Sequence, residues 1–241
     1  MKIEGKNPVK EILCSGATVE KVWLENGNRD AGLREIQKLA RDKGLRVEFV
    51  EKRALDRLSE TGHHQGVIAD YTNFEYASLE KLIKDSRAQN KDMLFLVLDE
   101  ILDPYNLGSI IRVAECAGAT GVIISNRRSA TVNETVVRTS AGATAYMPVV
   151  KVGNINQAIE TLKKENVWVY ALDMDGTEMY KTNLKGDIAL VVGNEGSGVK
   201  KLTEKLCDGV MSIPMFGKVN SLNASVSAGI AVYEVIRQRR T

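Results

Sequence analysis

An unbroken apolar run at residues 93–98 (MLFLVL) constrains the fold of this chain more than any other stretch. A strand without polar positions is buried on both faces, as in a parallel sheet covered by helices. Four further apolar runs follow, with helical patterns between several of them, at 122–125, 147–152, 167–172 and 188–192. Because strands alternate with helices, we predict an α/β fold whose parallel sheet carries helices on both faces.

The first 72 residues hold a smaller series of strand and helix patterns. Strands are predicted at 19–24, 46–50 and 66–71, and helices near 8–13, 33–40 and 55–58. We therefore predict a separate small α/β domain over 1–72 and a second domain over 92–241. Residues 73–91 are polar and mostly charged, which is typical of a linker, although Leu79, Leu82 and Ile83 can pack one face of a short helix there.

Composition excludes several classes of protein. The 241 residues are 44% hydrophobic and 27% charged, as in soluble globular proteins, and the net charge of +2 neither indicates nor excludes a nucleic-acid partner. The three cysteines are far apart and only two histidines are present, so no metal site is expected. Without a signal-peptide or membrane-spanning pattern, the protein is expected to be cytoplasmic and to have no membrane partner.

Two apolar runs near the C-terminus end in loops with polar residues. Residues 188–192 enter a loop with glycines at 193, 196 and 198, and residues 210–213 enter the loop 214–220. Both loops leave the carboxyl edge of the predicted sheet, where open α/β folds bind ligands. The polar residues there are Glu195, Ser221 and Asn223. The glycine spacing matches neither the dinucleotide fingerprint nor the P-loop, so taken alone it is equally consistent with a plain turn.

Two predicted helices carry further candidate residues. The helix 106–116 is expected to begin at Asn106 as its N-cap, and Arg112 falls off its apolar stripe. The last helix, 223–238, is rich in small residues in its first half, which predicts close packing against another helix, in the same chain or across a dimer. The segment 63–66 (HHQG) can contact a ligand or RNA, but a hydrogen-bonded turn is the favoured interpretation.

Three segments together form a recognisable pattern. They read N-L-G-x-x-x-R at 106–112, G-x-E-G-x-G at 193–198, and I-P-M followed by S-L-N-x-S-V-x-x-G at 213–229. In order and spacing they resemble the motifs of the SpoU, or TrmH-like, family of SPOUT RNA methyltransferases. The resemblance covers 91–241 closely. The first seventy residues, with GKNPVKEIL and HHQGVIA, resemble the RNA-binding domain of the RlmB-type 23S rRNA guanosine-2'-O-methyltransferases, which is similar to a ribosomal protein fold.

This resemblance implies a fold and a set of partners. The C-terminal domain would be a SPOUT fold with a deep trefoil knot, a rare exception to unknotted topology, and S-adenosylmethionine would bind in the knot. The protein would be a homodimer that methylates the 2'-hydroxyl of a ribose, most specifically a guanosine of 23S rRNA. The alternatives to this function are a ribose 2'-O-methyltransferase of tRNA, a resistance-type rRNA ribose 2'-O-methyltransferase, and a non-catalytic RNA-binding protein.

The resemblance also implies residue roles. Gly193, Ile213 and Leu222 would hold the cofactor, and the catalytic residues would be Arg112, Asn106, Glu195, Ser221 and Asn223. Arg112 would act either as the base that takes the 2'-hydroxyl proton or as a group that positions phosphate and oxygen. Its side-chain pKa in water, above about 12, makes it a difficult base, and the sequence leaves both roles open.

Overall fold

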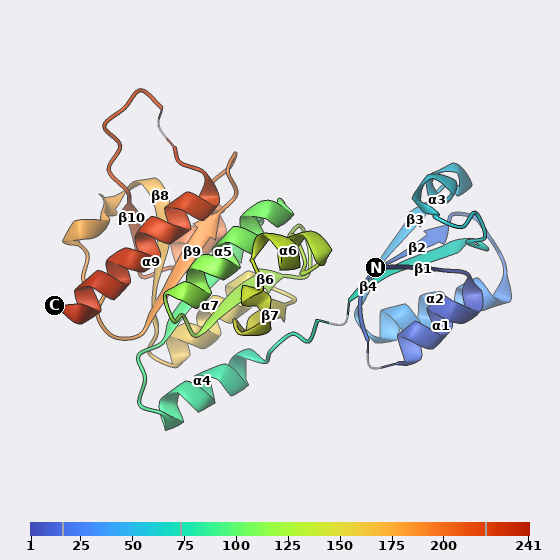
Figure 1. The fold of residues 1–241 in the computed structure, drawn as a ribbon, viewed down its shortest axis with the longest axis horizontal. Coiled ribbons are helices and arrows are strands. Elements are labelled where there is room, and N and C mark those ends of the chain that lie inside the picture. Colours follow the sequence, from blue (N-terminus) through green and yellow to red (C-terminus); the bar gives the residue numbers. More distant parts are fainter. Residues whose placement is uncertain (16, 73, 220) are drawn as a thin grey trace. The chain divides into compact units, whose positions relative to one another are not determined.

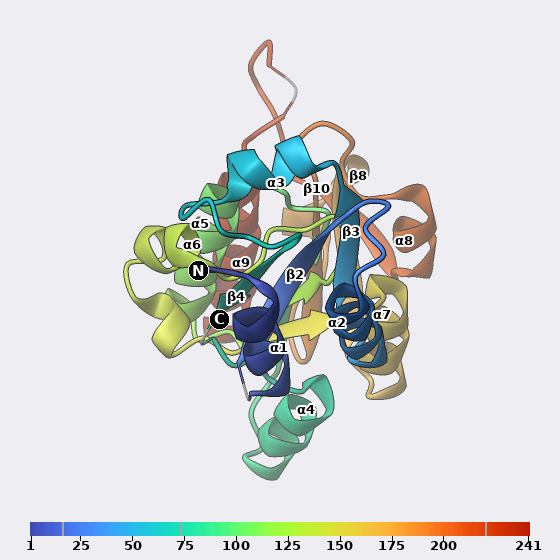
Figure 2. The same cartoon turned by 90° about the vertical axis from the view of Figure 1, so that its right-hand side faces the viewer.

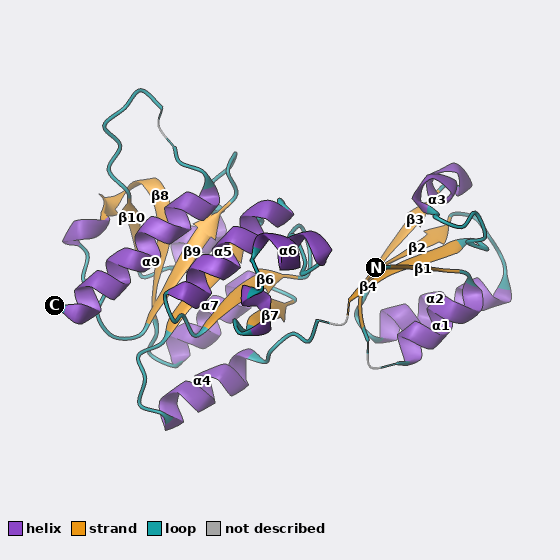
Figure 3. Ribbon diagram, in the orientation of Figure 1, coloured by secondary structure: helices purple, strands orange, loops and turns teal. Residues whose placement is uncertain are grey.

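The computed structural model describes residues 1–15, 17–72, 74–219 and 221–241, and it divides into two compact units, Met1–Glu75 and Tyr76–Thr241 (Figure 1). Each unit has its own sheet (Figure 3). The prediction of two α/β units is therefore confirmed at the level of the fold.

The first unit is a mixed four-stranded sheet with helices on both sides. Its strands have the order β1-β4-β2-β3, with β2 and β3 parallel and the other pairs antiparallel. The strands are β1 (Lys2–Glu4), β2 (Thr18–Glu25), β3 (Arg46–Val50) and β4 (Val67–Thr72). The helices are α1 (Lys6–Cys14), α2 (Ala31–Asp42) and α3 (Lys52–Leu58). Strand β1 is absent from the sequence prediction because three residues are too short to show a period.

Helices α1 and α2 lie side by side on one face of this sheet (Figure 2). Val9 and Ile36 of these helices meet Val22 of β2 in the core, because alternate residues of a strand point to the same face. Asp30 is the N-cap of α2, and its carboxylate accepts hydrogen bonds from the N–H groups of Gly32 and Leu33. This apolar face and this cap explain why the segment folds as a unit.

The second unit is a parallel six-stranded sheet with the order β10-β8-β9-β5-β6-β7. Its strands are β5 (Leu94–Asp99), β6 (Gly121–Ser125), β7 (Val149–Val152), β8 (Trp168–Glu178), β9 (Ile188–Gly193) and β10 (Gly209–Ser212). Its helices are α4 (Leu79–Ala88), α5 (Pro104–Cys116), α6 (Glu134–Thr139), α7 (Ile155–Lys164), α8 (Lys201–Leu206) and α9 (Ala224–Arg240), with short 3-10 turns η1 (Ala143–Ala145) and η2 (Met179–Lys181). The predicted parallel sheet is confirmed.

Helices cover both faces of this sheet. Helix α5 packs against α6 and α9 on one face, and α7 packs against α8 on the other (Figure 2). In the central strand β5, Phe95 and Val97 face the α7 side, so Leu94, Leu96 and Leu98 face α5 and α9. This burial on both faces accounts for the unbroken apolar run. The described residues contain no helix long and apolar enough to cross a membrane.

The segment predicted as a linker, 73–91, differs in the structure. From Tyr76 on it belongs to the second unit, and it contains α4. Leu79 and Ile83 of this helix are buried in the core on the α7 side. The charged composition arises because the opposite face of α4 is solvated, while its few apolar residues share one stripe. Asn73, within the predicted linker, lies outside the described residues.

One expectation about a helix is wrong, and for another helix one of two open alternatives is confirmed. Helix α5 begins at Pro104, two residues before Asn106, with Asp103 as its N-cap, so Asn106 is free for another role. In α9, Ala224, Ala228 and Ala231 are already buried within the chain, where α9 packs on α5 and β9. The small residues therefore serve packing inside one chain, and their burial says nothing of a dimer.

Candidate functional site

A cavity of about 480 Å³ opens where β8, β9 and β10 end or turn toward the carboxyl edge of the second sheet. Its walls come from residues 172–175 of β8, from the end of β9 with the glycine loop that follows, and from the segment after β10. Gly193, Ile213, Ser221 and Leu222, all predicted from the sequence, line it together with Glu195. Open α/β sheets bind ligands at this edge, and the volume suits a small organic ligand.

The glycine loop is a tight hairpin closed by its own backbone. Asn194 and Gly198 exchange two hydrogen bonds between N–H and C=O, at 3.1 and 2.8 Å. A Cβ on Gly193 would lie 2.1 Å from the carbonyl carbon of Gly198, so no other residue fits there without opening the hairpin. Gly198 itself has φ +65°, in the left-handed region. These two glycines are therefore required by the loop's shape.

Asn194 organises this hairpin from inside, a role that the sequence did not indicate. Its side-chain oxygen accepts a hydrogen bond from the N–H of Gly196 at 2.9 Å. Its side-chain N–H donates to the carbonyl of Glu100, at the end of the neighbouring strand β5, at 3.0 Å. The loop is thus tied to the sheet edge, which holds Glu195 in place.

Three predicted catalytic residues meet in one hydrogen-bonded cluster. Asn223 donates through Nδ2 to Oδ1 of Asn106 at 2.9 Å and to Oε1 of Glu195 at 3.3 Å. The side-chain N–H of Asn106 also donates to Glu195. Asn106 is only 6% exposed, so its amide depends on these partners to offset the cost of burial. The cluster joins the first turns of α5 and α9 to the glycine loop.

Asn223 is also the N-cap of α9. Its Oδ1 accepts from the N–H groups of Ser225 and Val226, at 2.9 and 3.3 Å, and from the hydroxyl of Ser225 at 2.6 Å. Because the oxygen is occupied by the helix, the NH₂ group has to point toward Asn106 and Glu195. The cap therefore orients the amide within the cluster.

Arg112 is placed differently. It is exposed on α5, about 9 Å along the helix axis from Asn106, and it is not among the described residues that line the cavity. The structure of one chain thus brings together Asn106, Glu195 and Asn223, with Ser221 on the cavity wall, but leaves Arg112 apart from them.

Other lining residues were missed by sequence reasoning. Asp173, Asp175 and Lys201 line the cavity, since β8 runs on past the predicted strand end at 172 and carries its carboxylates to the cavity. The alternation of Leu172, Met174 and Gly176 with these aspartates was the available signal. Among the described residues no group of three or more His, Cys, Asp or Glu side chains is arranged to hold a metal ion.

Gly108, in the N-L-G motif, serves the packing of two helices. A Cβ at this position would lie 2.7 Å from Cβ of Thr139 and 3.0 Å from the carbonyl oxygen of Val136, both in α6. The glycine lets α6 approach α5 closely next to Asn106. This explains why the motif needs a small residue there without any contact to a ligand.

The HHQG segment forms the hydrogen-bonded turn that was favoured from its sequence. The N–H of Gly66 donates to Nδ1 of the buried His64, whose Nε2 pairs with Asp56 at 2.9 Å. The side-chain oxygen of Gln65 accepts from the N–H of Lys6 at the start of α1. These polar groups hold together the edge of the first unit.

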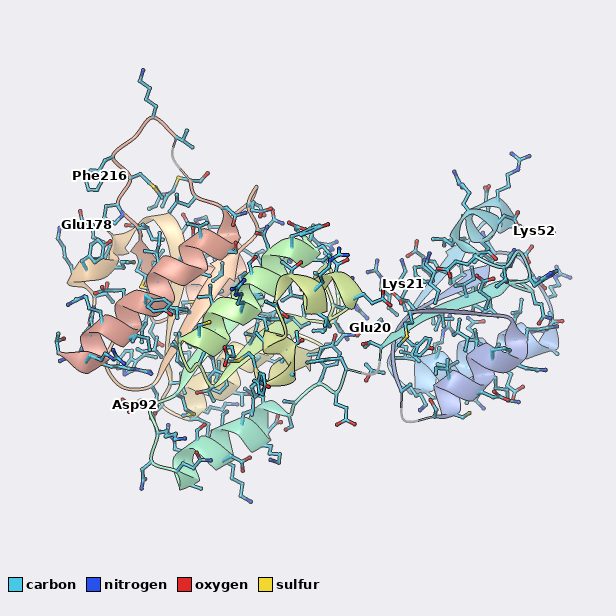
Figure 4. All side chains as sticks on the ribbon, in the orientation of Figure 1. Glu20, Lys21, Lys52, Asp92, Glu178 and Phe216 are labelled. Carbon is cyan, nitrogen blue, oxygen red and sulfur yellow. The ribbon has the colours of Figure 1, made fainter. Side chains whose placement is uncertain are left out.

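The loop after β10 forms the outer wall of the cavity. Met215 lines the cavity, whereas Phe216 beside it is 98% exposed and points away from the ribbon (Figure 4). This wall therefore consists of an exposed loop with apolar side chains, in contrast to the packed strands on the opposite side. Asn220, at the end of this loop, lies outside the described residues.

Comparison with known proteins agrees with these features. The profile of the SpoU rRNA Methylase family matches residues 93–233, and that of the RNA 2'-O ribose methyltransferase substrate binding domain matches residues 2–77. YacO of Bacillus subtilis, assigned to the TrmH family of tRNA/rRNA methyltransferases, is 40% identical over 237 residues, which are 98% of this chain and 94% of YacO. A TrmH family relative from Staphylococcus aureus is 39% identical over 98% of this chain and 96% of its own length.

Solved structures share the fold. The SpoU methyltransferase AviRb from Streptomyces viridochromogenes, in complex with AdoMet, superimposes with a TM-score of 0.62 at 24% identity, over 99% of this chain and 90% of AviRb. The TrmH/SpoU tRNA modifying enzyme of A. aeolicus has a TM-score of 0.57 at 27% identity, over 67% of this chain and 84% of that one. Because a family profile covers more than half of the chain and relatives match nearly all of it, this chain belongs to the SpoU, or TrmH, family of RNA methyltransferases.

Proposed function

We propose that this protein transfers a methyl group from S-adenosylmethionine to a ribose 2'-hydroxyl of RNA, specifically a guanosine of 23S rRNA. The observation that carries the proposal is the meeting of three distant motifs at one sheet edge. Asn106, Glu195 and Asn223 form one cluster directly beside a cavity lined by Gly193, Ile213 and Leu222.

The cavity fits the cofactor in size and chemistry. Leu172, Ile213 and Leu222 supply apolar wall for a flat ring system, and the hairpin after Gly193 presents backbone groups. The carboxylates of Asp173 and Asp175 favour a cationic ligand, and the bound cofactor supplies a methyl group on a positively charged sulfur. We assign Gly193, Ile213 and Leu222 to cofactor binding. A trefoil knot in this part of the chain stays a prediction.

The cluster and Ser221 are suited to position the acceptor ribose. Glu195 is held by two amide N–H donors, so its carboxylate has a fixed orientation at the edge of the cavity. Orientation of reacting groups supplies much of the rate of a displacement, with effective molarities of about 10⁵ M or more. Arg112 then acts on the 2'-hydroxyl either as its base or, through its planar fork, by holding an RNA phosphate beside it.

We assign RNA binding to the first unit, predicted as a domain over 1–72. The match of residues 2–77 to a substrate-binding family supports this assignment. The relatives are described as tRNA/rRNA methyltransferases, and the presence of this additional unit favours rRNA over tRNA.

We also propose that the protein is a homodimer. Val226 and Tyr233 lie two turns apart on the same face of α9, and both are about half exposed. Identical subunits associate most often through a two-fold contact, and such a contact would cover this face of α9. Light scattering of the wild type and of Tyr233→Glu tests it, with a monomeric wild type as the contrary result.

Methyl transfer from labelled S-adenosylmethionine to purified 23S rRNA and to bulk tRNA tests the main proposal. We expect labelled 23S rRNA, with the modified 2'-oxygen mapped to one guanosine by primer extension. Label in tRNA alone would favour the tRNA alternative, and no label in either RNA would contradict the proposal.

A further inference from the structure

A second cavity, of about 350 Å³, lies at the same carboxyl edge of the second sheet and shares no lining residue with the first. It is bounded by the end of β5, the segment after β6, the first turn of α7 and the residue before α8. Its charged lining residues are Asp99, Glu100, Arg127, Arg128 and Lys200.

The topology of the sheet favours a ligand at this place. Strands β5 and β9 are neighbours, but the chain leaves β5 for α5 on one face and leaves β9 for α8 on the other. In open α/β sheets a ligand crevice forms outside the carboxyl ends of strands where the connections diverge in this way. Asp99 and Glu100 follow from β5 and Lys200 from the segment after β9, so the second cavity lies at this switch point.

The ion pairs and hydrogen bonds among the described residues of this cavity leave the guanidinium of Arg127 without a carboxylate partner. Glu100 accepts a hydrogen bond from Nζ of Lys200 at 2.6 Å and lies 3.7 Å from Nη1 of Arg128. Asp99 accepts from the backbone N–H of Lys200 at 3.0 Å. Arg127 is exposed, and within the described parts of the chain its guanidinium has neither an ion pair nor a hydrogen bond. Three cations thus face two carboxylates, and both carboxylates are engaged.

We infer that this cavity binds a phosphate group of the RNA backbone, with Arg127 and Arg128 as its contacts. The planar guanidinium fork matches the oxygens of a phosphate, and the N–H groups in the first turn of α7 add partial positive charge. The end of β9 lines the first cavity and the end of β6 lines the second. Only β5 lies between these strands, so they are two inter-strand distances apart, about 10 Å, and one RNA strand can reach both cavities at once. The inference rests on the proposed function in taking RNA as the ligand.

The test compares Arg127→Ala/Arg128→Ala with the wild type. RNA affinity is measured by filter binding of 23S rRNA at several salt concentrations, and kcat and KM are measured with the same RNA. We expect RNA binding to be about tenfold weaker, and the slope of log affinity against log salt concentration to be smaller by about one unit. The KM for RNA should rise, and kcat should stay unchanged. Calorimetric affinity for S-adenosylmethionine should stay that of the wild type.

Two variants control for charge and position. Lys185→Ala removes one exposed cation just before β9, at the opposite, amino edge of the sheet, and should leave RNA affinity within twofold of the wild type. Arg127→Lys with Arg128 intact keeps the charge and should retain most of the affinity.

Equal RNA affinity and equal salt slope for Arg127→Ala/Arg128→Ala and Lys185→Ala would overturn the inference. The failure of the proposed function has a different signature, because it would show as a wild-type protein that binds RNA but transfers no methyl group. In that case the RNA affinity of Arg127→Ala/Arg128→Ala relative to the wild type still decides whether the cavity binds phosphate.

Discussion

Asn223 combines two roles at the residue scale, capping α9 through its oxygen and donating to Asn106 and Glu195 through its nitrogen. Asn223→Ser keeps an N-cap of similar strength but removes the amide donor. We expect an almost unchanged melting temperature and a large loss of methyl transfer.

Asn223→Ala is the matched control, because it removes both roles and should also cost about 1 kcal/mol of stability. Thermal unfolding and initial rates of methyl transfer measure the two effects. A fully active Asn223→Ser protein would show that the amide contributes only to capping.

Arg112 should be needed for activity but not for folding or cofactor binding. It is exposed on α5 and outside the cavity, so Arg112→Ala should leave S-adenosylmethionine affinity within a few-fold. We expect methyl transfer to fall by about 10²- to 10⁴-fold, the range of a lost acid–base group.

Arg112→Lys separates the two possible roles, since lysine keeps the charge and loses the fork. A pH–rate profile whose rising limb shifts to lower pH would support a base, because the pKa of lysine lies below that of arginine, and an unshifted profile with a raised KM would support positioning. Wild-type rates in Arg112→Ala would remove this residue from the mechanism.

Glu4 joins β1 to the segment before the HHQG turn. Partial burial by itself raises the pKa of this carboxyl, but hydrogen bonds from the hydroxyls of Ser59 and Thr61 and from the N–H groups of Glu60 and Thr61 lower it from 4.5 to about 2. The folded state thus favours the ionised form. Its stabilising contribution is present above pH 4.5 and is lost as the pH falls toward 2.

We therefore expect Glu4→Gln to be less stable than the wild type at pH 7, with a difference that shrinks as the pH approaches 2. Thermal unfolding of both proteins between pH 7 and pH 2.5 measures it. A difference in melting temperature that does not change with pH would mean that ionisation of Glu4 is not the cause.

At the scale of an element, the glycine loop depends on close approach of its two ends. In Gly193→Ala the new Cβ would lie 2.1 Å from the carbonyl carbon of Gly198, so the hairpin has to open. Overpacking costs about 1–3 kcal/mol, so we expect S-adenosylmethionine affinity to fall about 10- to 100-fold.

Gly196→Ala is the matched control in the same loop. Its Cβ would meet only Oδ1 of Asn194 at 3.5 Å, an ordinary contact, so the hairpin keeps its shape and cofactor affinity should fall much less than in Gly193→Ala. Isothermal titration calorimetry of both variants makes the comparison. Equal affinities would place cofactor binding away from the hairpin.

At the scale of the whole molecule, the division at Tyr76 determines where the chain can be cut. We expect residues 76–241 to fold and to bind cofactor but to methylate 23S rRNA poorly without the first unit. A chain starting at residue 91 lacks α4, and the loss of buried Leu79 and Ile83 should cost about 1.5–3 kcal/mol for each.

Chemical denaturation of the two fragments compares their stabilities, and methyl transfer compares their activities. Full activity of 76–241 on 23S rRNA would contradict an RNA-binding role of the first unit. Equal stability of the two fragments would contradict the role of α4 in the core.

Much of this architecture was predictable because its signals are local. Strand β5 follows from its unbroken apolar run, and helix α2 follows from an apolar stripe at helical spacing. Glu195, Asn223 and Gly193 could be placed at the sheet edge because they follow apolar runs, whereas Asn106 and the roles of all four residues were predicted from the resemblance to family motifs. By contrast, α4 was expected to be a linker, because only its packing partners show that its apolar stripe is buried.

The sequence by itself determined most of the strands and helices, the position of the loops at the sheet edge and the family, because these depend on periodicity, on propensity and on residues close in the chain. Only the tertiary structure decided that Asn106 and Asn223, 117 residues apart, share a hydrogen bond. It also decided that Asn194 holds the loop and that Arg127 lies at a second cavity. The physical reason is that these contacts depend on strand order and helix packing, which bring distant segments together and leave no period in the sequence.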